Sequence, residues 1–218
     1  MRALTPLEAR VLGVLVEKQH TVPDTYPLSL NTLVAGVNQK TARDPVINAT
    51  EAEVLTAVDG LKSLSLVFEG SGSRVVRFEH NMARVFSLPA ASVALLTLLL
   101  LRGPQTSAEL RLHCERLHRF ADISSVEGFL DELASMEPAR VLKLPRAPGA
   151  REARWAQLLC GDVAIDTAAA ASAATAEAGV SAGEIAALKA EQARLADELA
   201  QLRALVQRMA AELGIDAA

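Results

Sequence analysis

Residues 50–79 read TEAEVLTAVDGLKSLSLVFEGSGSRVVRFE and predict one helix followed by a two-stranded hairpin. Thr50 and Glu53 have the spacing of a capping box, in which each side chain binds a free backbone N–H at the start of a helix. Apolar residues then recur at helical spacing. Two β-prone runs, 66–68 and 74–78, flank a Gly-Ser-Gly-Ser turn. A helix that leads directly into a hairpin, after two earlier helices, is typical of a winged helix.

Two helices are predicted before this unit. Thr5 and Glu8 form another capping box, with a proline at the first helical position, where its missing N–H is not needed. Ser29 can cap a short helix over residues 30–37. The connector 38–45 is polar and contains no apolar periodicity, so we expect a loop between the second and third helices.

The same order of elements is predicted again in residues 85–162. An apolar helix over 88–101 comes first, and a helix opened by Thr106 comes second. We place the start of the third helix at a capping box beginning at Ser124, and a hairpin over 141–158 follows it. The repeated order indicates two copies of one unit rather than one larger arrangement.

The spacing of the two sets supports an internal duplication. Ser124 follows Thr50 at the same separation in sequence at which Val141, in the second hairpin, follows Val67 in the first. Two different elements at one offset favour duplication over a chance recurrence. We therefore predict a mainly α fold with small β-hairpins, of the α+β class, in which each copy encloses its own aliphatic interior. The predicted domains are a first winged helix over 1–84 and a second over 85–162.

The remaining residues predict a linker and a coiled coil. Fourteen of the 21 residues in 163–183 are Ala, Ser or Thr, which is typical of a linker. Apolar residues in 184–214 alternate by three and four, as in a heptad seam. A parallel homodimer is favoured, because glutamates beside the seam would then face Lys189 and Arg203 of the partner subunit; a lone amphipathic helix that folds back is the alternative. The predicted dimerisation residues are Ile185, Leu188, Gln192, Leu195, Leu199, Leu202, Val206, Met209 and Leu213.

The charge distribution does not indicate a strongly basic protein. Residues 1–84 hold nine Lys/Arg and nine Asp/Glu, and residues 85–162 also hold nine of each. Residues 163–218 hold four against eight, which accounts for the net charge of −4. A general electrostatic attraction to nucleic acid is therefore not expected. Two isolated cysteines and the absence of a run of about 20 apolar residues favour a cytoplasmic protein without a membrane helix.

Several stretches resemble the YceH-like family of bacterial proteins, described as tandem winged-helix proteins of unknown function. The resemblance covers about residues 1–162. It implies the tandem winged-helix fold and brings no established activity and no catalytic residues. We interpret the matching polar stretches as having no packing role. The matching stretches are Leu7-Glu8-Ala9-Arg10-Val11-Leu12-Gly13, Glu17-Lys18, Tyr26-Pro27-Leu28-Ser29-Leu30-Asn31, Asn38-Gln39-Lys40-Thr41, Arg43-Asp44-Pro45-Val46, Gly72-Ser73-Arg74-Val75, Leu99-Leu100-Leu101-Arg102-Gly103, Gln105-Thr106, Glu109-Leu110-Arg111, Pro148-Gly149, Glu152 and Arg154.

The chain lacks the usual sequence signatures of an enzyme. It has no G-x-S-x-G elbow, no Walker loop and no H-E-x-x-H pair. The Gly-Ser turn leads from strand to strand, whereas a phosphate-binding loop leads into a helix N-terminus. The four histidines are scattered along the sequence. We expect no catalytic activity, no cofactor, no metal and no small-molecule substrate.

Two non-enzymatic functions fit the sequence. Binding of double-stranded DNA, in a transcription-related role, is slightly favoured because cations occur on both hairpins, although acidic third helices would be repelled by phosphates. The alternative is a protein-docking subunit, which the acidic third helices and the dimerising tail fit equally well. Ordinary solvated surface charge also accounts for the same cations. The candidate nucleic-acid-binding residues are Lys40, Arg43, Lys62, Arg74, Arg77, Arg111, Arg116, Arg119, Lys143, Arg146, Arg151 and Arg154.

Overall fold

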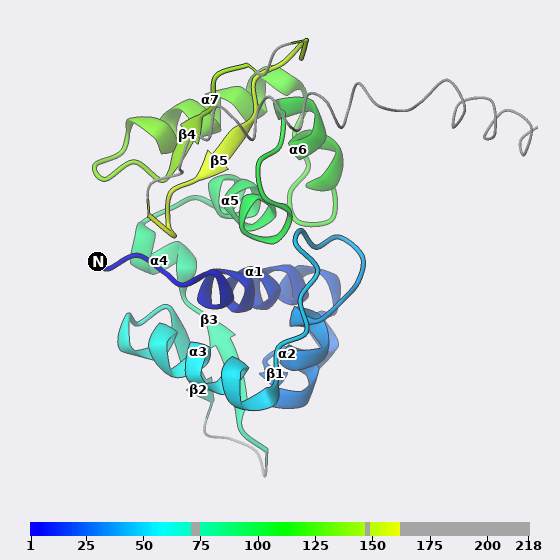
Figure 1. Ribbon diagram of the computed structural model, residues 1–218, viewed down its shortest axis with the longest axis vertical. Coiled ribbons are helices and arrows are strands. Elements are labelled where there is room, and N and C mark those ends of the chain that lie inside the picture. The colour runs from blue at the N-terminus through cyan, green and yellow to red at the C-terminus, as the bar shows by residue number, and fades with distance from the viewer. Residues whose placement is uncertain (71–74, 147–148, 162–218) are drawn as a thin grey trace, which may run out of the picture. The chain divides into compact units, whose positions relative to one another are not determined.

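The computed structural model describes residues 1–70, 75–146 and 149–161 (Figure 1). These residues belong to one unit built from helices and small antiparallel sheets, so the predicted α+β class is confirmed. Arg74, which we predicted on the first hairpin, lies outside the described residues. The same holds for the predicted linker 163–183 and the predicted coiled coil 184–214, including its seam from Ile185 to Leu213.

Helices and hairpins alternate along the chain in two similar sets. The first set ends with β3 and the second with β5, and the short helix α4 connects them. In chain order the elements are α1 (Pro6–Thr21), the 3₁₀ turn η1 (Pro23–Thr25), β1 (Leu28–Ser29), α2 (Leu30–Val37), α3 (Glu51–Ser63), β2 (Val67–Gly70), β3 (Arg77–His80), α4 (Met82–Phe86), α5 (Ala90–Arg102), α6 (Ser107–His113), α7 (Ile123–Ser135), β4 (Val141–Lys143) and β5 (Trp155–Gln157).

Local capping explains where most helices begin. The predicted capping boxes at Thr5, Thr50 and Thr106 are confirmed, since each threonine hydroxyl accepts the N–H of the glutamate three residues on and that carboxylate accepts the threonine N–H. Ser29 caps α2 as predicted. These side chains satisfy backbone donors that have no partner inside the helix.

The predicted capping box at the start of α7 is wrong. Asp122 is the cap, and its carboxylate accepts the Ser125 N–H at 2.7 Å, so the helix begins at Ile123. Glu127 does not return to the helix start but accepts a hydrogen bond from the Ser107 hydroxyl at 3.2 Å. Because the Asp122 carboxylate binds the Ser125 N–H, the helix begins before the predicted cap at Ser124. The offset between the caps of α3 and α7 is therefore no longer equal to the offset between the hairpins.

Both hairpins lie against the segment that precedes the second helix of their set. The first sheet has the order β1-β3-β2, with Leu28 paired to Phe78. In the second set β4 pairs with β5, and Gln105 forms an isolated bridge to Trp155. Gln105 follows Leu28 at the same offset at which Trp155 follows Phe78. This corner recurs as an internal duplication predicts.

An arginine in each set fastens this corner. Arg77 Nη1 donates to the carbonyl of Pro27 at 2.8 Å, and Arg154 Nη1 donates to the carbonyl of Pro104 at 3.0 Å. Arg154 follows Arg77, and Pro104 follows Pro27, at the same sequence offset as Trp155 follows Phe78. The repeated contact ties the last strand of each hairpin to the turn before the second helix.

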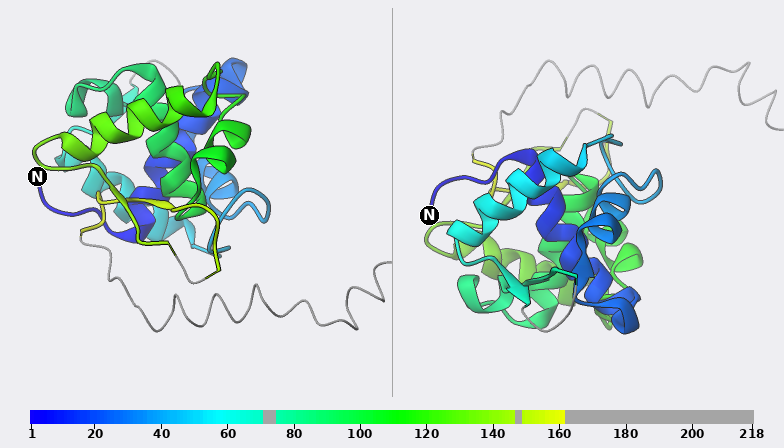
Figure 2. Two further views of the ribbon diagram at one scale, coloured as in Figure 1. Left: turned by 90° about the horizontal axis from the view of Figure 1, so that it is seen from above. Right: turned by 90° about the horizontal axis from the view of Figure 1, so that it is seen from below.

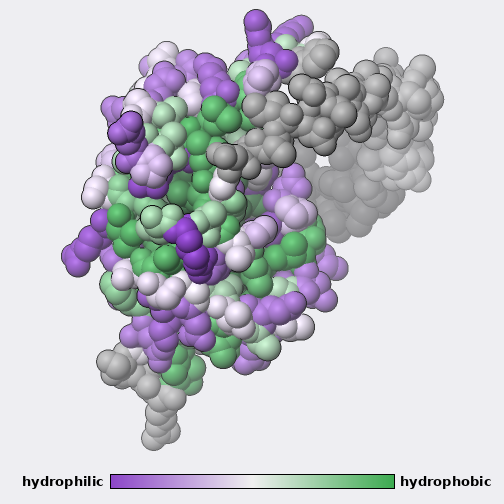
Figure 3. Space-filling model, turned by 60° about the vertical axis from the view of Figure 1, so that its left-hand side comes forward, coloured by the Kyte–Doolittle hydropathy of each residue, from purple (hydrophilic) through white to green (hydrophobic). Residues whose placement is uncertain are grey.

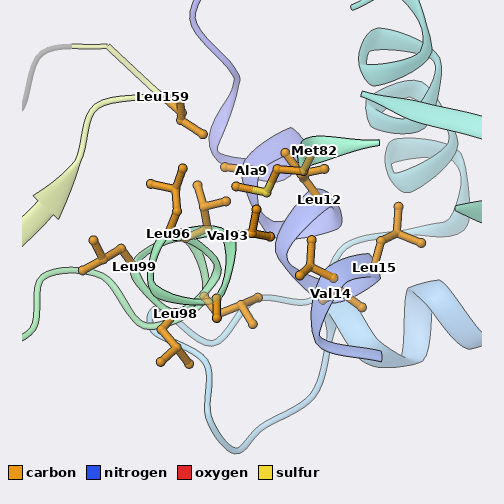
Figure 4. Packing of buried hydrophobic residues seen from close by; sticks show 14 of the residues in the cluster. Ala9, Leu12, Val14, Leu15, Met82, Val93, Leu96, Leu98, Leu99 and Leu159 are labelled. Carbon is orange, nitrogen blue, oxygen red and sulfur yellow. The ribbon is translucent and has the colours of Figure 1, made fainter. Parts of the chain in front are cut away.

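The hydrophobic interior is shared by the two sets. Helices α1 and α5 pack side by side in the middle, with Ala9, Leu12 and Leu15 on one and Val93 and Leu96 on the other (Figure 4). One cluster of buried side chains extends across both sets. The prediction that each copy encloses its own interior is therefore wrong, because α5 is buried along almost its whole length. The domain boundary at residue 84 stays a prediction.

The third helices of the two sets lie on opposite sides of this central pair. Seen from above, α7 covers the α5 side, and seen from below, α3 covers the α1 side (Figure 2). The two hairpins accordingly lie at opposite ends of the described unit (Figure 1). A surface on one set therefore faces a different direction from the corresponding surface on the other.

Candidate functional site

The connection between α2 and α3 is a closed loop rather than a short turn. Asn38 closes it, because its side-chain Nδ2 donates to the Ala49 carbonyl at 2.8 Å and its Oδ1 accepts the Ala49 N–H at 2.7 Å. We call residues 38–50 the α2–α3 loop. A loop whose ends are held together in this way is compact and is frequently a functional element.

Arg43 occupies the centre of this loop. Its side chain is 0% exposed and forms a two-point ion pair with Glu17 of α1, with Nη1 at 3.0 Å and Nη2 at 2.5 Å from the carboxylate oxygens. It also donates to the Gly36 and Ala42 carbonyls. Arg43 is therefore removed from the predicted nucleic-acid-binding residues, because no phosphate can reach it.

Arg10 of α1 supports the other side of the same loop. It is 4% exposed, and its Nη2 donates to the Pro45 carbonyl at 2.7 Å. Its Nε and Nη1 have no hydrogen-bond partner within the described residues. Burial lowers the Arg10 pKa, and the nearby positive charge of Arg43 lowers it further. The polar stretches around Glu17, Asn38 and Arg43 thus have a packing role, and our interpretation that they have none is wrong.

The end of the α2–α3 loop borders the second set of elements. The Asp44 N–H donates to the Leu101 carbonyl near the C-terminus of α5 at 2.9 Å. Beside this contact is a pocket of about 270 Å³, which we call the seam pocket. Its lining residues come from the loop, from α5 and α6, and from the segments just before α6 and β5, and the polar ones are Arg43, Asp44, Arg102, Gln105, Glu109, His113 and Arg154.

Gln105 fixes the ring of His113 in the wall of the seam pocket. Gln105 is buried, and its Nε2 donates to the Leu98 carbonyl at 3.2 Å. Its Oε1 therefore faces His113 Nδ1, at 2.7 Å, so Nδ1 carries the proton and donates. Burial and the charge of Arg102 lower the His113 pKa. The ring is held in one orientation and is predominantly neutral at neutral pH.

A second hollow lies between α3 and the first hairpin. It has a volume of about 430 Å³, and we call it the α3 groove. On the face shown in the space-filling view, hydrophobic residues lie at the surface among polar ones (Figure 3). Leu55, Val75 and Val76 of the groove are 40%, 56% and 47% exposed. The side chains that line the groove include Leu30, Glu51, Leu55, Asp59, Lys62, Glu69, Val75, Val76 and Phe78.

The charges around the α3 groove are mostly negative. Among the described residues that line it, Lys62 is the one cation, and its Nζ lies 2.5 Å from a Glu69 oxygen and 3.7 Å from an Asp59 oxygen. These partners raise the Lys62 pKa, chiefly through the hydrogen bond to Glu69. Glu51 adds a further negative charge at the helix start. Lys62 is therefore compensated, and the groove presents an apolar floor with an acidic rim.

Comparison with known proteins assigns the chain to a family. The model of a family described as "Protein of unknown function, DUF480" matches residues 4–150. The chain belongs to the DUF480 family. The resemblance to YceH-like bacterial proteins is thereby confirmed.

Full-length relatives of this DUF480 member occur in several bacteria. A UPF0502 protein of Burkholderia thailandensis is 70% identical over 217 residues, covering all of this chain and 92% of the relative. A UPF0502 protein of Cupriavidus pinatubonensis is 67% identical over 216 residues, covering 99% of this chain and 92% of the relative. One from Leptothrix cholodnii is 66% identical over 216 residues, with coverage of 99% and 97%.

The remaining predicted cations of this DUF480 chain are dispersed over several elements. Lys40 is exposed on the α2–α3 loop, and Arg111, Arg116 and Arg119 are exposed on α6 and the segment after it. Arg111 donates to the Ala121 carbonyl at 3.1 Å. The structure does not bring these cations onto one element with those of the first hairpin.

The cations of the two hairpins are partly engaged in the fold. Arg77 and Arg154 donate to the backbone carbonyls described above, and Arg154 also contacts Glu109. Lys143 lies over the Trp155 ring, with Nζ 5.1 Å from the ring centroid. Arg146 and Arg151 are exposed near the turn of the second hairpin. Since the hairpins lie at opposite ends of the unit, their cations do not form one continuous surface (Figure 1).

Sequence reasoning missed the apolar floor of the α3 groove. Leu55 is part of the predicted apolar helix, but it directly follows Val54 and so lies off the buried face formed by Val54, Val58 and Leu61. Val75 and Val76 belong to a predicted strand, yet β3 begins only at Arg77. The available signal for Leu55 was its place next to Val54, because adjacent residues of a helix do not lie on the same face.

Within residues 1–70, 75–146 and 149–161, no group of three or more His, Cys, Asp or Glu side chains is placed to hold a metal ion. Over the same ranges, no helix combines the length and apolarity needed to cross a membrane.

Proposed function

We propose that this chain is a non-enzymatic tandem winged-helix protein that docks a protein partner in the α3 groove. The winged-helix assignment is supported by the order α1-β1-α2-α3-β2-β3 and by the β1-β3-β2 sheet. The second set repeats the three helices, the corner bridge and the hairpin. Each hairpin is then the wing of its set.

The observation that carries the docking proposal is the chemistry of the exposed face of α3. In winged helices that read DNA, the third helix enters the major groove and presents donors to base edges. Here the corresponding face carries Leu55, Glu51 and Asp59. Carboxylates there would be repelled by phosphates, whereas exposed apolar side chains with a polar rim favour a protein surface.

Cross-linking from the groove tests this proposal. A photoreactive residue replaces Leu55 in the full chain, and a matched one replaces Leu112, which is 69% exposed on α6. We expect a defined protein adduct from position 55 and none from position 112. The partner identified in this way should then lose affinity for the Glu51→Lys, Asp59→Lys double variant. Nucleic acid cross-linked at position 55, or identical adducts from both positions, would contradict the proposal.

DNA binding in a transcription-related role is the second candidate. It is supported by the exposed Arg146 and Arg151 near the second wing and by Arg116 and Arg119 after α6. Such binding would depend on phosphate contacts and would weaken steeply with salt. Arg146→Glu with Arg151→Glu should then abolish retention of a mixed-sequence duplex, while Arg84→Glu on α4 should not. A wild-type chain that retains no duplex even at low salt excludes this candidate.

The proposed assembly is a cytoplasmic homodimer formed through residues 184–214. The heptad seam in the sequence supports it, and two linked copies would strengthen a weak single-site affinity for one partner assembly. Leu195→Lys with Leu202→Lys should produce a monomer in analytical ultracentrifugation. Gln201→Lys, outside the seam, serves as the control and should remain dimeric. An unchanged mass of the double variant would refute the assignment.

A further inference from the structure

The seam pocket has a wall that is held in place independently of any ligand. Arg43 is fixed by Glu17, and Gln105 is fixed by the Leu98 carbonyl and orients His113. Arg154 is fastened to the Pro104 carbonyl and to Glu109. A pocket with preorganised polar groups loses little side-chain entropy when it binds a small molecule.

Arg102 differs from the other cations of the pocket. Within the described residues its guanidinium forms no hydrogen bond and no salt bridge, although the side chain is partly buried at the end of α5. Burial is the main cause of the lowered Arg102 pKa, and the positive charge of Arg43 lowers this pKa further. None of the Arg102 nitrogens is among the buried, unpaired atoms of the described residues, so these donors reach solvent and are accessible to an anionic ligand.

The charges nearby leave Arg102 uncompensated. Arg43 is neutralised by Glu17, and Arg154 pairs with Glu109. The carboxylate of Asp44 acts on the buried Arg10. Among the described carboxylates, Glu17 is the one that favours the charged form of Arg102, and it is already engaged by Arg43. One positive charge in the pocket is therefore available for an anion.

We propose that the seam pocket binds a small anion through a phosphate or carboxylate group held by Arg102 and His113. A guanidinium can donate two parallel hydrogen bonds to either group. His113 Nδ1 already donates to Gln105, so the other ring nitrogen, Nε2, can donate when the ring takes up a proton. Asp44 and Glu109 favour a ligand that also carries hydroxyl or amine donors. A volume of about 270 Å³ suits a small metabolite or a terminal phosphate group.

Such a ligand would contact residues of both sets of elements at once. The pocket is built from the α2–α3 loop of the first set and from α5, α6 and Arg154, just before β5, of the second. An anion that binds the folded chain stabilises it by mass action. This inference does not depend on the α3 groove, which lies beside different elements.

Titration of the full chain with inorganic phosphate and, separately, with citrate tests the inference at constant ionic strength. We expect a saturable rise in melting temperature with at least one probe. The His113 ring nitrogen signals should move in NMR during the same titration, while those of His20 should not. If only phosphate is effective, the pocket takes a phosphate group; if only citrate is effective, it takes carboxylates.

Variants separate specific binding from a general salt effect. Arg102→Gln should weaken binding by about tenfold or more, because a hydrogen-bonded charged group is lost. The matched variant Arg84→Gln removes an exposed arginine of α4 and should bind like the wild type. The His113 shift in the wild-type chain keeps the test decisive if Arg102→Gln folds poorly. An equal rise in melting temperature in the Arg102→Gln variant, or no saturable response to either probe, overturns the inference.

Discussion

The corner between the second helix and the hairpin is built in the same way in both sets, whereas the connection between the second and third helices is not. Arg77 and Arg154 make equivalent contacts to the carbonyls of Pro27 and Pro104. The first set then has the α2–α3 loop, held by Asn38 and Arg43, but the second set continues from α6 through a different segment to the Asp122 cap.

This difference shows which part of a repeated arrangement can vary. The corner carries strand pairing and buried side chains, so changes there disturb both the sheet and the core. The connection lies outside the sheet and can acquire its own contacts. In this chain the loop of the first set has acquired contacts to the second, and it lines the seam pocket.

The two arginine ion pairs provide the sharpest test of this contrast. Arg43→Ala removes a fully buried guanidinium and leaves the largely buried Glu17 carboxylate with the longer Lys18 contact at 3.5 Å, so we expect a loss of about 3–5 kcal/mol in the free energy of unfolding. Arg154→Ala removes a pair whose side chains are 42% and 39% exposed, and we expect a loss of about 1 kcal/mol or less. Urea unfolding of the two variants measures both values. Equal losses would show that the loop contributes no more than the surface pair.

The position after the corner also differs, because His80 of the first set corresponds to Gln157 of the second at the offset that relates the two corners. Each side chain accepts a backbone N–H, from Met82 at 3.3 Å and from Cys160 at 3.1 Å. Burial lowers the His80 pKa to about 4, and the positive charge of His20 contributes. His80 is thus neutral when folded, and its Nε2 donates to the side-chain Oε1 of Gln19 at 2.7 Å.

Stability should therefore fall as the solution is acidified below the unfolded pKa of histidine. The unfolded chain takes up a proton near pH 6.5, whereas folded His80 does so only near its lowered pKa of about 4. The free energy of unfolding should drop by about 1.5 kcal/mol from pH 6.5 to pH 5. In His80→Gln, which copies the second set, the contribution of His80 to this drop should disappear, and the contribution of His113, whose pKa is also lowered, should remain. An unchanged pH profile in that variant would contradict the assignment.

Glycines in the third helices give a smaller contrast of opposite sign. A Cβ at Gly60 would meet the Glu8 carboxylate, which caps α1 and pairs with Arg2. Gly60→Ala should destabilise the chain by about 1 kcal/mol through loss of this cap. Around Gly128 of α7 a Cβ would meet nothing within 4 Å, so Gly128→Ala should stabilise by up to about 1 kcal/mol. Thermal unfolding distinguishes the two signs, and a gain in both variants would contradict the predicted contact at Gly60.

Because the two sets share one interior, we predict that they unfold together in a single transition. Trp155 is the single tryptophan and is buried in the second set, so its fluorescence reports that set. Protected amides of α3 report the first set by hydrogen exchange. Because α1 and α5 share one core, both probes should give the same free energy of unfolding. Two distinct values would instead support independent domains divided near residue 84.

Part of the fold follows from short-range patterns that the sequence displays directly. The caps at Thr5, Ser29, Thr50 and Thr106 join residues only three positions apart. The recurrence of helices and hairpins is also visible in the spacing of the chain. The cap of α7 shows the limit of this reasoning, because two neighbouring residues could each begin the helix and only the folded backbone selects Asp122.

The candidate sites were less accessible to sequence reasoning. Arg43 has the same residue type as a phosphate-binding surface cation, and its burial depends on Glu17, which lies far earlier in the chain on α1. Arg102 and His113 become neighbours of the α2–α3 loop only when α5 packs against α1. Residue type indicated positive charge in each case, but not whether that charge had a partner.

Local chemistry in the sequence thus determined most of the helix starts, the hairpins and the repeated order of elements, because each depends on residues close together in the chain. Tertiary packing decided that the two sets share one interior, that Arg43 is buried, and that Leu55 and Arg102 face hollows. Those outcomes depend on which helix faces meet, and side chains far apart in the sequence determine that together.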